Sequence, residues 1–259
     1  IMTKVGIVAI LRVQAVALAP AMPDLLDHWL TTLALATIVF AALGALAAAR
    51  LRALAAWLVL LSAGTMLLVP AQASAEVSAA ALYYLVQSTL AGAACFLLSD
   101  LIAAQRGKVA DQFMAGPPLQ AIWLKVAFLV LATTAAALPP FSGFIGKLML
   151  LSSLRSAAAA PVMWTVLLTS GFVVMAALAR DGCYLIWKHK ATARPLALEA
   201  IGWQRATAVL LLVAAGPLLA LLARPLADYT ARAAAQLHAP GGYVTGVLGA
   251  SATNREAAP

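Results

Sequence analysis

Long apolar runs alternate with short polar stretches from the first residue to about residue 223. Seven runs stand out: 1–19, 28–49, 53–70, 77–104, 119–154, 161–187 and 206–223. A helix needs about 20 mostly apolar residues to cross the ~30 Å hydrocarbon core of a bilayer. The pattern therefore predicts an all-α integral membrane protein, a polytopic bundle of about seven transmembrane helices.

Composition strengthens this interpretation. The chain is 64% hydrophobic and 10% charged, whereas a soluble domain carries roughly a quarter charged residues. Its net charge of +8 does not indicate nucleic-acid binding, because the basic residues lie between apolar runs and form no single patch. We expect membrane lipid and no nucleic acid as a partner. We also expect a transmembrane bundle over 1–223 and a C-terminal interfacial tail over 224–259.

The run at 119–154 is too long for one straight crossing. Its 36 residues would form a helix of about 54 Å at ~1.5 Å per residue. The chain either turns back as a hairpin at "PPFSG" or forms a single span that is broken in mid-membrane. A single span collects most basic loop residues on one side, which marks the cytoplasm. These residues are Arg50, Arg52, Arg106, Lys108, Lys188, Lys190, Arg194 and Arg205. A hairpin would spoil this bias, so we predict the broken span.

The residues at the break suit an interrupted helix. Pro139 and Pro140 remove backbone donors and clash with the preceding turn, so the first half-helix should end near Leu138. Gly143 would let the chain resume close to a neighbour, and Ser142 would cap the second half-helix. Freed backbone groups are tolerated at membrane depth only where protein or water satisfies them. The break therefore predicts a hydrated interior.

Two lysines lie inside apolar runs. Lys147 comes eight residues before Arg155, with no acidic residue within a helical turn. Burial favours the neutral form of a lysine, so Lys147 could lose and regain a proton; alternatively it is a fixed cation paired with a carboxylate from another helix. Lys4 has the same character. Arg12, on roughly the same face, stays protonated and would set a local field.

Other polar residues in the spans have ordinary structural explanations. Lys125 can snorkel to the interface, Arg180 and Asp181 can form a structural pair, and Asp100 suits a helix end. Hydroxyls and amides near Gln87 could order water or hydrogen-bond neighbouring helices. Two buried lysines with a proline-broken helix nevertheless indicate ion movement.

Several stretches carry a resemblance to a known family. They are "TKVGIVAILRV", "LRALAAWLVLLSAGTMLL", "ALYYLVQSTLAGAACFLLSDLI", "LPPFSGFIGKL" and "LADYTARAAAQLHAPGGYVTGVLG". The sequence resembles the antiporter-like membrane subunits. This family is shared by the multisubunit monovalent-cation/proton antiporters (Mrp or Pha type) and the membrane arm of respiratory NADH:quinone oxidoreductase. The last stretch resembles the D-type subunit of the cation antiporters in particular.

The resemblance implies a fourteen-helix fold of two inverted five-helix repeats, of which this chain would be the C-terminal half. Lys4 matches the central lysine of helix eight, and Lys147 matches the lysine of broken helix twelve. Gln87 falls where the family frequently has histidine, and glutamine cannot titrate. The implied proton path contains Lys4, Gln87, Lys147 and Arg12.

The function implied is a subunit of a hetero-oligomeric Na⁺ or K⁺/proton antiporter in the bacterial cytoplasmic (inner) membrane. The alternatives are a proton-pumping subunit of NADH:quinone oxidoreductase and a chain that packs in a complex without conducting. We expect no cofactor, no metal and no enzymatic site, because the sequence has no CxxC, His pair or Gly-rich nucleotide loop. Cys95 and Cys183 are expected to be small core residues.

Overall fold

The structure is a computed structural model that describes residues 2–14, 25–72, 74–119, 121–188 and 202–239. These residues are helical and contain no strand, although Arg50 and Gln112 form an isolated β-bridge. The helices are α1 (Met2–Val13), α3 (Leu25–Ala47), α4 (Leu51–Leu67), α5 (Ala75–Arg106), α6 (Ile122–Ala135), α7 (Ser142–Ser153), α8 (Ala160–Ile186), α9 (Trp203–Leu221) and α10 (Ala223–Leu237).

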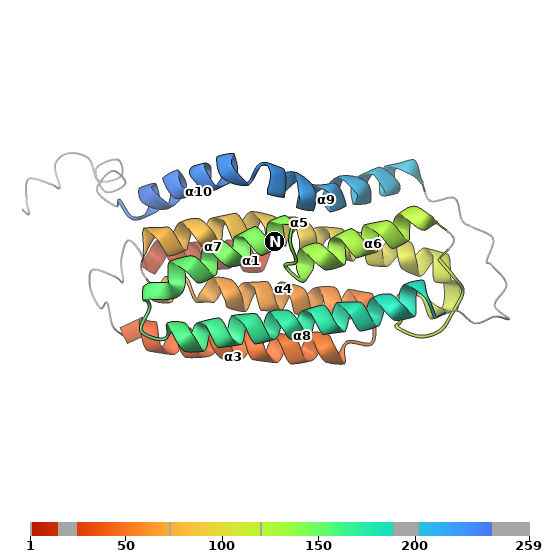
Figure 1. Cartoon of the computed structure of the whole chain (residues 1–259), viewed down its shortest axis with the longest axis horizontal. Helices are drawn as coiled ribbons and strands as arrows, with labels where there is room; N and C mark the ends of the chain where they lie inside the picture. The colour runs from red at the N-terminus through yellow and green to blue at the C-terminus, as the bar shows by residue number, and fades with distance from the viewer. Residues whose placement is uncertain (1, 15–24, 73, 120, 189–201, 240–259) are drawn as a thin grey trace, which may run out of the picture.

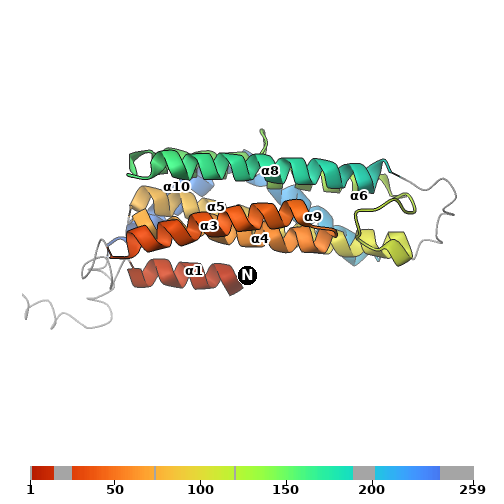
Figure 2. The ribbon, with the colours of Figure 1, turned by 90° about the horizontal axis from the view of Figure 1, so that it is seen from below.

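The helices lie side by side along the long axis of the molecule (Figure 1). Helix α5 is the central element, because it packs against α4, α6, α7, α9 and α10. Helices α3 and α8 pack together on one side of the bundle, and α9 and α10 lie on the other (Figure 1). Viewed at right angles, α1 and α8 lie on opposite faces (Figure 2). The core around α5 is therefore enclosed by helices from both ends of the sequence.

All seven predicted apolar runs contain a helix within the described residues. Four helices are long and apolar enough to cross a membrane: His28–Ala47, α5, α8 and α9. Helices α4 and α6 are apolar but shorter. The prediction of an all-α membrane protein is confirmed, since the pattern of apolar runs corresponds to the pattern of helices.

The run at 119–154 forms two helices that follow one another in the same direction. Helix α6 ends at Ala135 and α7 begins at Ser142, and the two lie end to end along the bundle (Figure 1). Ala137 has a positive φ of 58°, a left-handed conformation that a helix cannot continue through. The first half-helix therefore ends three residues before the predicted Leu138, and the chain does not turn back as a hairpin.

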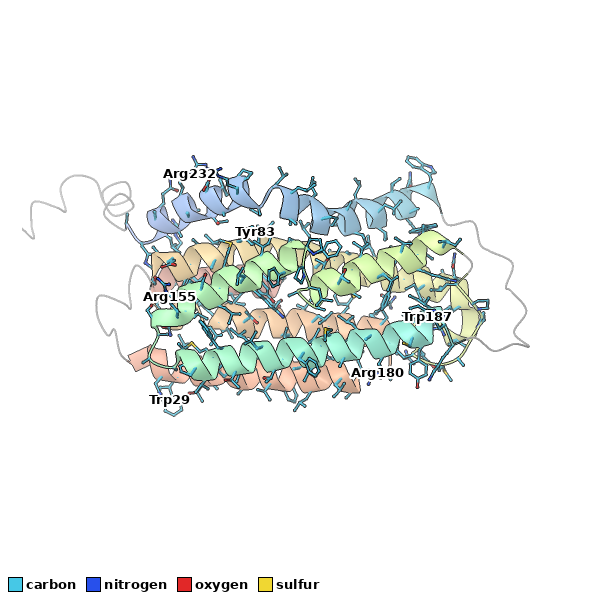
Figure 3. The ribbon with its side chains drawn as sticks, viewed as in Figure 1. Trp29, Tyr83, Arg155, Arg180, Trp187 and Arg232 are labelled. Carbon is cyan, nitrogen blue, oxygen red and sulfur yellow. The ribbon has the colours of Figure 1, made fainter. Side chains whose placement is uncertain are left out.

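The connections at one end of the bundle are basic and held by hydrogen bonds. Buried Arg106 donates hydrogen bonds to the carbonyl oxygens of Gln112 and Met114, both at 2.6 Å, and Asp111 accepts one from the backbone N–H of Arg52. Arg180 and Trp187 lie at this end of the molecule, and Arg155 lies at the opposite end (Figure 3). Arg50, Arg52 and Arg106 are thus held at one end of the bundle by the connection at 107–118.

Helix α10 continues the course of α9 and packs against α5. The Oγ atom of Ser78 lies 2.9 Å from Nε2 of His238, which ties the end of α10 to the start of α5. The predicted tail thus begins as a helix, and its residues 240–259 lie outside the described residues.

Candidate functional site

The break between α6 and α7 packs directly against the centre of α5. A methyl group at Gly143 would overlap the carbonyl oxygen of Thr134 and approach the side chain of Gln87. A methyl group at Gly146 would meet ring atoms of Tyr83 at 3.3 Å and of Tyr84 at 3.4 Å, a tight contact without overlap. Only glycine lets the first turn of α7 come this close to α6 and α5.

Ser142 does not cap α7 as predicted. Phe141 occupies the N-cap position, and no side chain caps the helix. Ser142 is instead the first residue of α7, and its hydroxyl oxygen is buried without a hydrogen-bond partner among the described residues. Buried polar groups nearly always have a hydrogen-bond partner. The hydroxyl of Ser142 is therefore a polar group in the break that is available to hydrogen-bond water. Pro139 and Pro140 lie in the break with exposed side chains.

Lys4 is buried and reaches α5. Its side chain is 5% exposed, and its Nζ donates a hydrogen bond of 2.5 Å to the Oγ of Ser88. Ser88 in turn donates to the carbonyl oxygen of Tyr84, at 2.6 Å. Lys4 is therefore anchored on the helix turn that also carries Gln87.

A cavity of about 40 Å³ lies beside this turn, between α4, α5, the break and α7. One water molecule requires roughly 10–15 Å³ of such space, so the cavity has room for about three. Its polar lining consists of Ser62, Tyr84, Gln87, Ser88, Thr134 and Lys147. Gln87 and Lys147 thus line the same cavity, and the hydrated interior stays a prediction.

Lys147 has no partner of opposite charge within the part of the chain that the structure describes. Across the described residues no hydrogen bond or ion pair involves its ammonium, and none of the residues that line the cavity is a carboxylate. A methyl group at Gly171 of α8 would lie 3.2 Å from its Nζ. The alternative of a fixed ion pair therefore finds no support within the described residues, and Lys147 connects to Lys4 through the cavity and Ser88.

Arg12 is not brought to the cavity. It lies in the last turn of α1 with an exposed side chain, whereas Lys4 on the same helix is buried. Eight residues at ~3.6 per turn rotate the second side chain away from the first, so the common face expected from the sequence is only approximate. The cysteines also differ from one another: Cys95 is buried and lines the cavity, but Cys183 is exposed and not a core residue.

The remaining charges form structural contacts. Arg180 pairs with fully buried Asp181 at 2.7 Å and donates to the carbonyl oxygen of Leu46 at 2.6 Å. Arg52 and Asp100 form an exposed pair at 3.2 Å. No group of three or more residues that could hold a metal ion occurs among the described residues.

Sequence reasoning missed two parts of this site. Ser62 contributes a hydroxyl from α4, and Gly171 makes space for the lysine on α8. Neither residue has a sequence signal of its own, because serine and glycine are frequent at helix–helix contacts in membranes. Only their placement next to Lys147 distinguishes them.

With this geometry in view, comparison with known proteins identifies the family. A family model described as "NADH:quinone oxidoreductase/Mrp antiporter, TM" matches residues 1–176, which include both lysines and the break. The chain belongs to this family. The resemblance noted in the sequence is therefore confirmed for the family as a whole.

Curated relatives include antiporter subunits of the D type. This chain is 32% identical over 274 aligned positions to the probable K(+)/H(+) antiporter D-type subunit of Rhizobium meliloti (strain 1021), covering 93% of this chain and 50% of that protein. It is 27% identical over 251 positions to the Na(+)/H(+) antiporter D-type subunit of Bacillus subtilis (strain 168), covering 96% and 50%. The chain spans about half the length of these relatives.

Solved structures share the fold. A chain in the structure of the Mrp complex from Dietzia sp. DQ12-45-1b matches with a TM-score of 0.80 at 22% identity, covering 95% of this chain and 53% of that one. A chain of respiratory complex I from Thermus thermophilus with bound NADH matches with a TM-score of 0.66 at 24% identity, covering 82% and 45%. At such identities the likeness establishes the fold alone.

Proposed function

We propose that this chain belongs to a membrane subunit of a monovalent-cation/proton antiporter and carries part of its proton path. The observation that supports this most directly is the cavity that joins Lys147 to Ser88, the residue on which Lys4 is anchored. Neither lysine has a carboxylate partner among the described residues. With room for a few waters beside them, the two lysines and Ser88 form a chain of groups that can exchange protons. Names of the antiporter relatives agree with this reading.

The two lysines act as a relay in this proposal. Two ammonium groups around one small cavity repel each other, so protonation of Lys147 favours loss of the proton from Lys4, and the reverse. Ser88 accepts from the Lys4 ammonium, and its hydroxyl can also donate, so it passes a proton without holding a charge. Gln87 cannot titrate and has the role of orienting the water beside it. Arg12 supplies a constant positive field from the end of α1.

The break supplies the hydrated environment. We propose seven membrane crossings, with α6 and α7 as two halves of one crossing that is interrupted in mid-membrane. The backbone N–H groups of Ala136, Ala137, Leu138 and Phe141 are satisfied by nearby carbonyl oxygens, so in this proposal water serves the carbonyl oxygens that the break leaves over. Gly143 holds the break against α5, which keeps the break next to the polar residues of that helix.

The chain's membrane, partners and exchanged ion follow from the same reading. The basic end of the bundle faces the cytoplasm, in the inner membrane of a bacterium, and other subunits of a hetero-oligomeric complex complete the transporter. The exchanged ion is Na⁺ or K⁺. The alternative is a proton-pumping subunit of an NADH:quinone oxidoreductase, a complex of the kind that one structural neighbour comes from. In neither case does this chain supply a redox site.

Transport in everted membrane vesicles tests the proposal. Vesicles containing the complete complex are given a proton gradient, and addition of Na⁺ or K⁺ should dissipate it without NADH. Lys147→Ala should reduce this cation-dependent proton movement to the background level, with the complex still assembled. Lys125→Ala, a matched lysine on α6 outside the cavity lining, should leave it unchanged. Proton movement that requires NADH and quinone would favour the alternative.

A further inference from the structure

A second and larger cavity lies on the other side of Lys147. It has a volume of about 330 Å³ and lies between α7, the break and α8. Its lining is apolar apart from the backbone and the single ammonium of Lys147; the larger side chains include Leu138, Phe144, Leu148, Leu168, Phe172 and Met175. We call this cavity the lateral groove. Its volume falls within the ~300–1,000 Å³ of typical small-molecule sites.

The lateral groove opens sideways from the bundle. The side chains at its edge are strongly exposed, with Leu168 at 57% and Phe172 at 66%. Residues of both α7 and α8 line the groove, and α1 lies on the opposite face of the bundle from α8 (Figure 2). In a membrane-spanning bundle, such an apolar opening faces the acyl chains and not water.

Among the described residues, Lys147 is the only charged group in the groove lining. Gly171 leaves open the space next to the ammonium, where a methyl group would lie 3.2 Å from Nζ. Because the ammonium has no ion-pair partner among the described residues, its positive charge is uncompensated in an apolar site. An anionic head group would compensate it, and a cationic one would be repelled.

We propose that the lateral groove binds a lipophilic monocarboxylic acid, such as a single-chain fatty acid, with the carboxyl group at Lys147 and the acyl chain along α7 and α8. The acid enters from the bilayer in its neutral form. Its proton moves from the carboxyl oxygen to a neutral Nζ, which yields an ammonium–carboxylate pair with no change in net charge. A phospholipid fits less well, because its charged head group remains at the membrane surface while Lys147 lies in the middle of α7.

Binding would also regulate the proposed transport, and this consequence rests on the proposed function. A carboxylate at Lys147 fixes the lysine in its protonated form and removes it from the exchange with Lys4. Occupancy of the groove from the lipid side would therefore inhibit antiport without closing the water-filled cavity.

Photolabelling of the protein, expressed from its complete gene and kept in native membranes, tests the binding. The probe is a long-chain carboxylic acid with a diazirine in its tail, and the controls are its methyl ester and an amine of equal length. The acid should label residues 144–175 at least tenfold more strongly than either control. Lys147→Met and the groove-filling Leu168→Trp should each lower labelling about tenfold, and Lys125→Met should not.

Several outcomes would overturn the proposal. They are equal labelling by acid and ester, labelling that survives Lys147→Met, and exclusion of the acid in the assembled complex because a helix of another subunit covers the groove. The failure of the proposed function looks different. Selective, Lys147-dependent labelling together with normal antiport by Lys147→Ala would leave the groove assignment intact and would reject the proton path.

Discussion

At the residue scale, Lys147 lies between the small cavity with polar lining and the apolar lateral groove, and the chemistry of its charged group decides what it can do. Lys147→Arg keeps a positive charge at the same place, but a guanidinium does not release its proton in proteins. We expect this variant to assemble and to lose cation-dependent proton exchange, measured in vesicles beside Lys147→Ala. Exchange at the normal rate would mean that residue 147 is a fixed structural cation and that the relay does not exist.

Gly143 is the residue on which the geometry of the break depends. Gly143→Ala places a methyl group against the carbonyl oxygen of Thr134, and overpacking of this kind typically costs ~1–3 kcal/mol. We expect a lower thermal unfolding temperature in detergent and reduced transport. Gly6→Ala on α1 is the matched control, because nothing lies within 4 Å of the added methyl group. Equal behaviour of the two variants would contradict the close packing of α7 on α6.

The two lysines were predictable because a charge within an apolar run is conspicuous. Their connection was not predictable. The contact between Lys4 and Ser88 joins residues 84 positions apart in sequence, and Ser88 is one of several hydroxyl residues on α5. Which of them faces α1 depends on the rotation of α5 in the bundle, and that rotation is set by packing with five other helices.

At the scale of the elements, α8 is fastened to the turn between α3 and α4 by Arg180. Removing it leaves buried Asp181 uncompensated. Arg180→Met should lower the free energy of unfolding by less than the ~3–5 kcal/mol typical of breaking a fully buried ion pair, because the Arg180 side chain is 40% exposed. Arg52→Met, in a pair that is 57% and 61% exposed, should cost under ~1 kcal/mol.

Thermal unfolding of the detergent-solubilised protein measures both effects. Asp181→Asn introduced together with Arg180→Met should recover part of the loss, because it removes the unpaired charge. If Arg180→Met is no more destabilising than Arg52→Met, the Arg180–Asp181 contact is not a structural fastening.

The elements themselves followed closely from the apolar pattern, and their ends followed less well. Proline positions indicated the interruption after α6. Helix α6 ends earlier than expected because Ala137 adopts a left-handed conformation, and an alanine-rich sequence gives no signal for that conformation. Ser142 had the residue type of a cap, yet Phe141 holds the N-cap position. Burial of Ser142 against neighbouring helices outweighs its local preference.

For the molecule as a whole, the interrupted α6–α7 crossing fixes which connections share a side of the membrane. We predict that the connection after α8 is cytoplasmic and that the one between α7 and α8 is external. Thr192 in the connection after α8 lies outside the described residues. The probe positions are therefore Lys188, just past the end of α8, and Ala157, between α7 and α8. Each is changed to cysteine in a protein whose exposed Cys183 has been replaced.

A membrane-impermeant maleimide should label Ala157→Cys in intact cells, and Lys188→Cys only after permeabilisation. Labelling of Lys188→Cys in intact cells, with Ala157→Cys protected until permeabilisation, would mean that residues 119–154 turn back as a hairpin. Labelling of both positions from the same side would mean that α8 does not cross the membrane. This arrangement is predicted from the alternating basic loops of the sequence, because positive charges mark the cytoplasmic side.

The small size of the cavity beside Lys147 also bears on selectivity. A proton moves by exchange of hydrogen bonds along two or three waters, whereas Na⁺ or K⁺ must travel bodily with its hydration shell or with replacement ligands. The cavity of about 40 Å³ is too small for a hydrated alkali cation, and its described lining has a lysine but no carboxylate that could replace the water ligands. The cavity would thus select protons over Na⁺ or K⁺ because protons hop between waters whereas the metal ions must diffuse, and ionic radius would not be the deciding property. The exchanged cation would then need a route of its own, coupled to this one only through conformation or electrostatics.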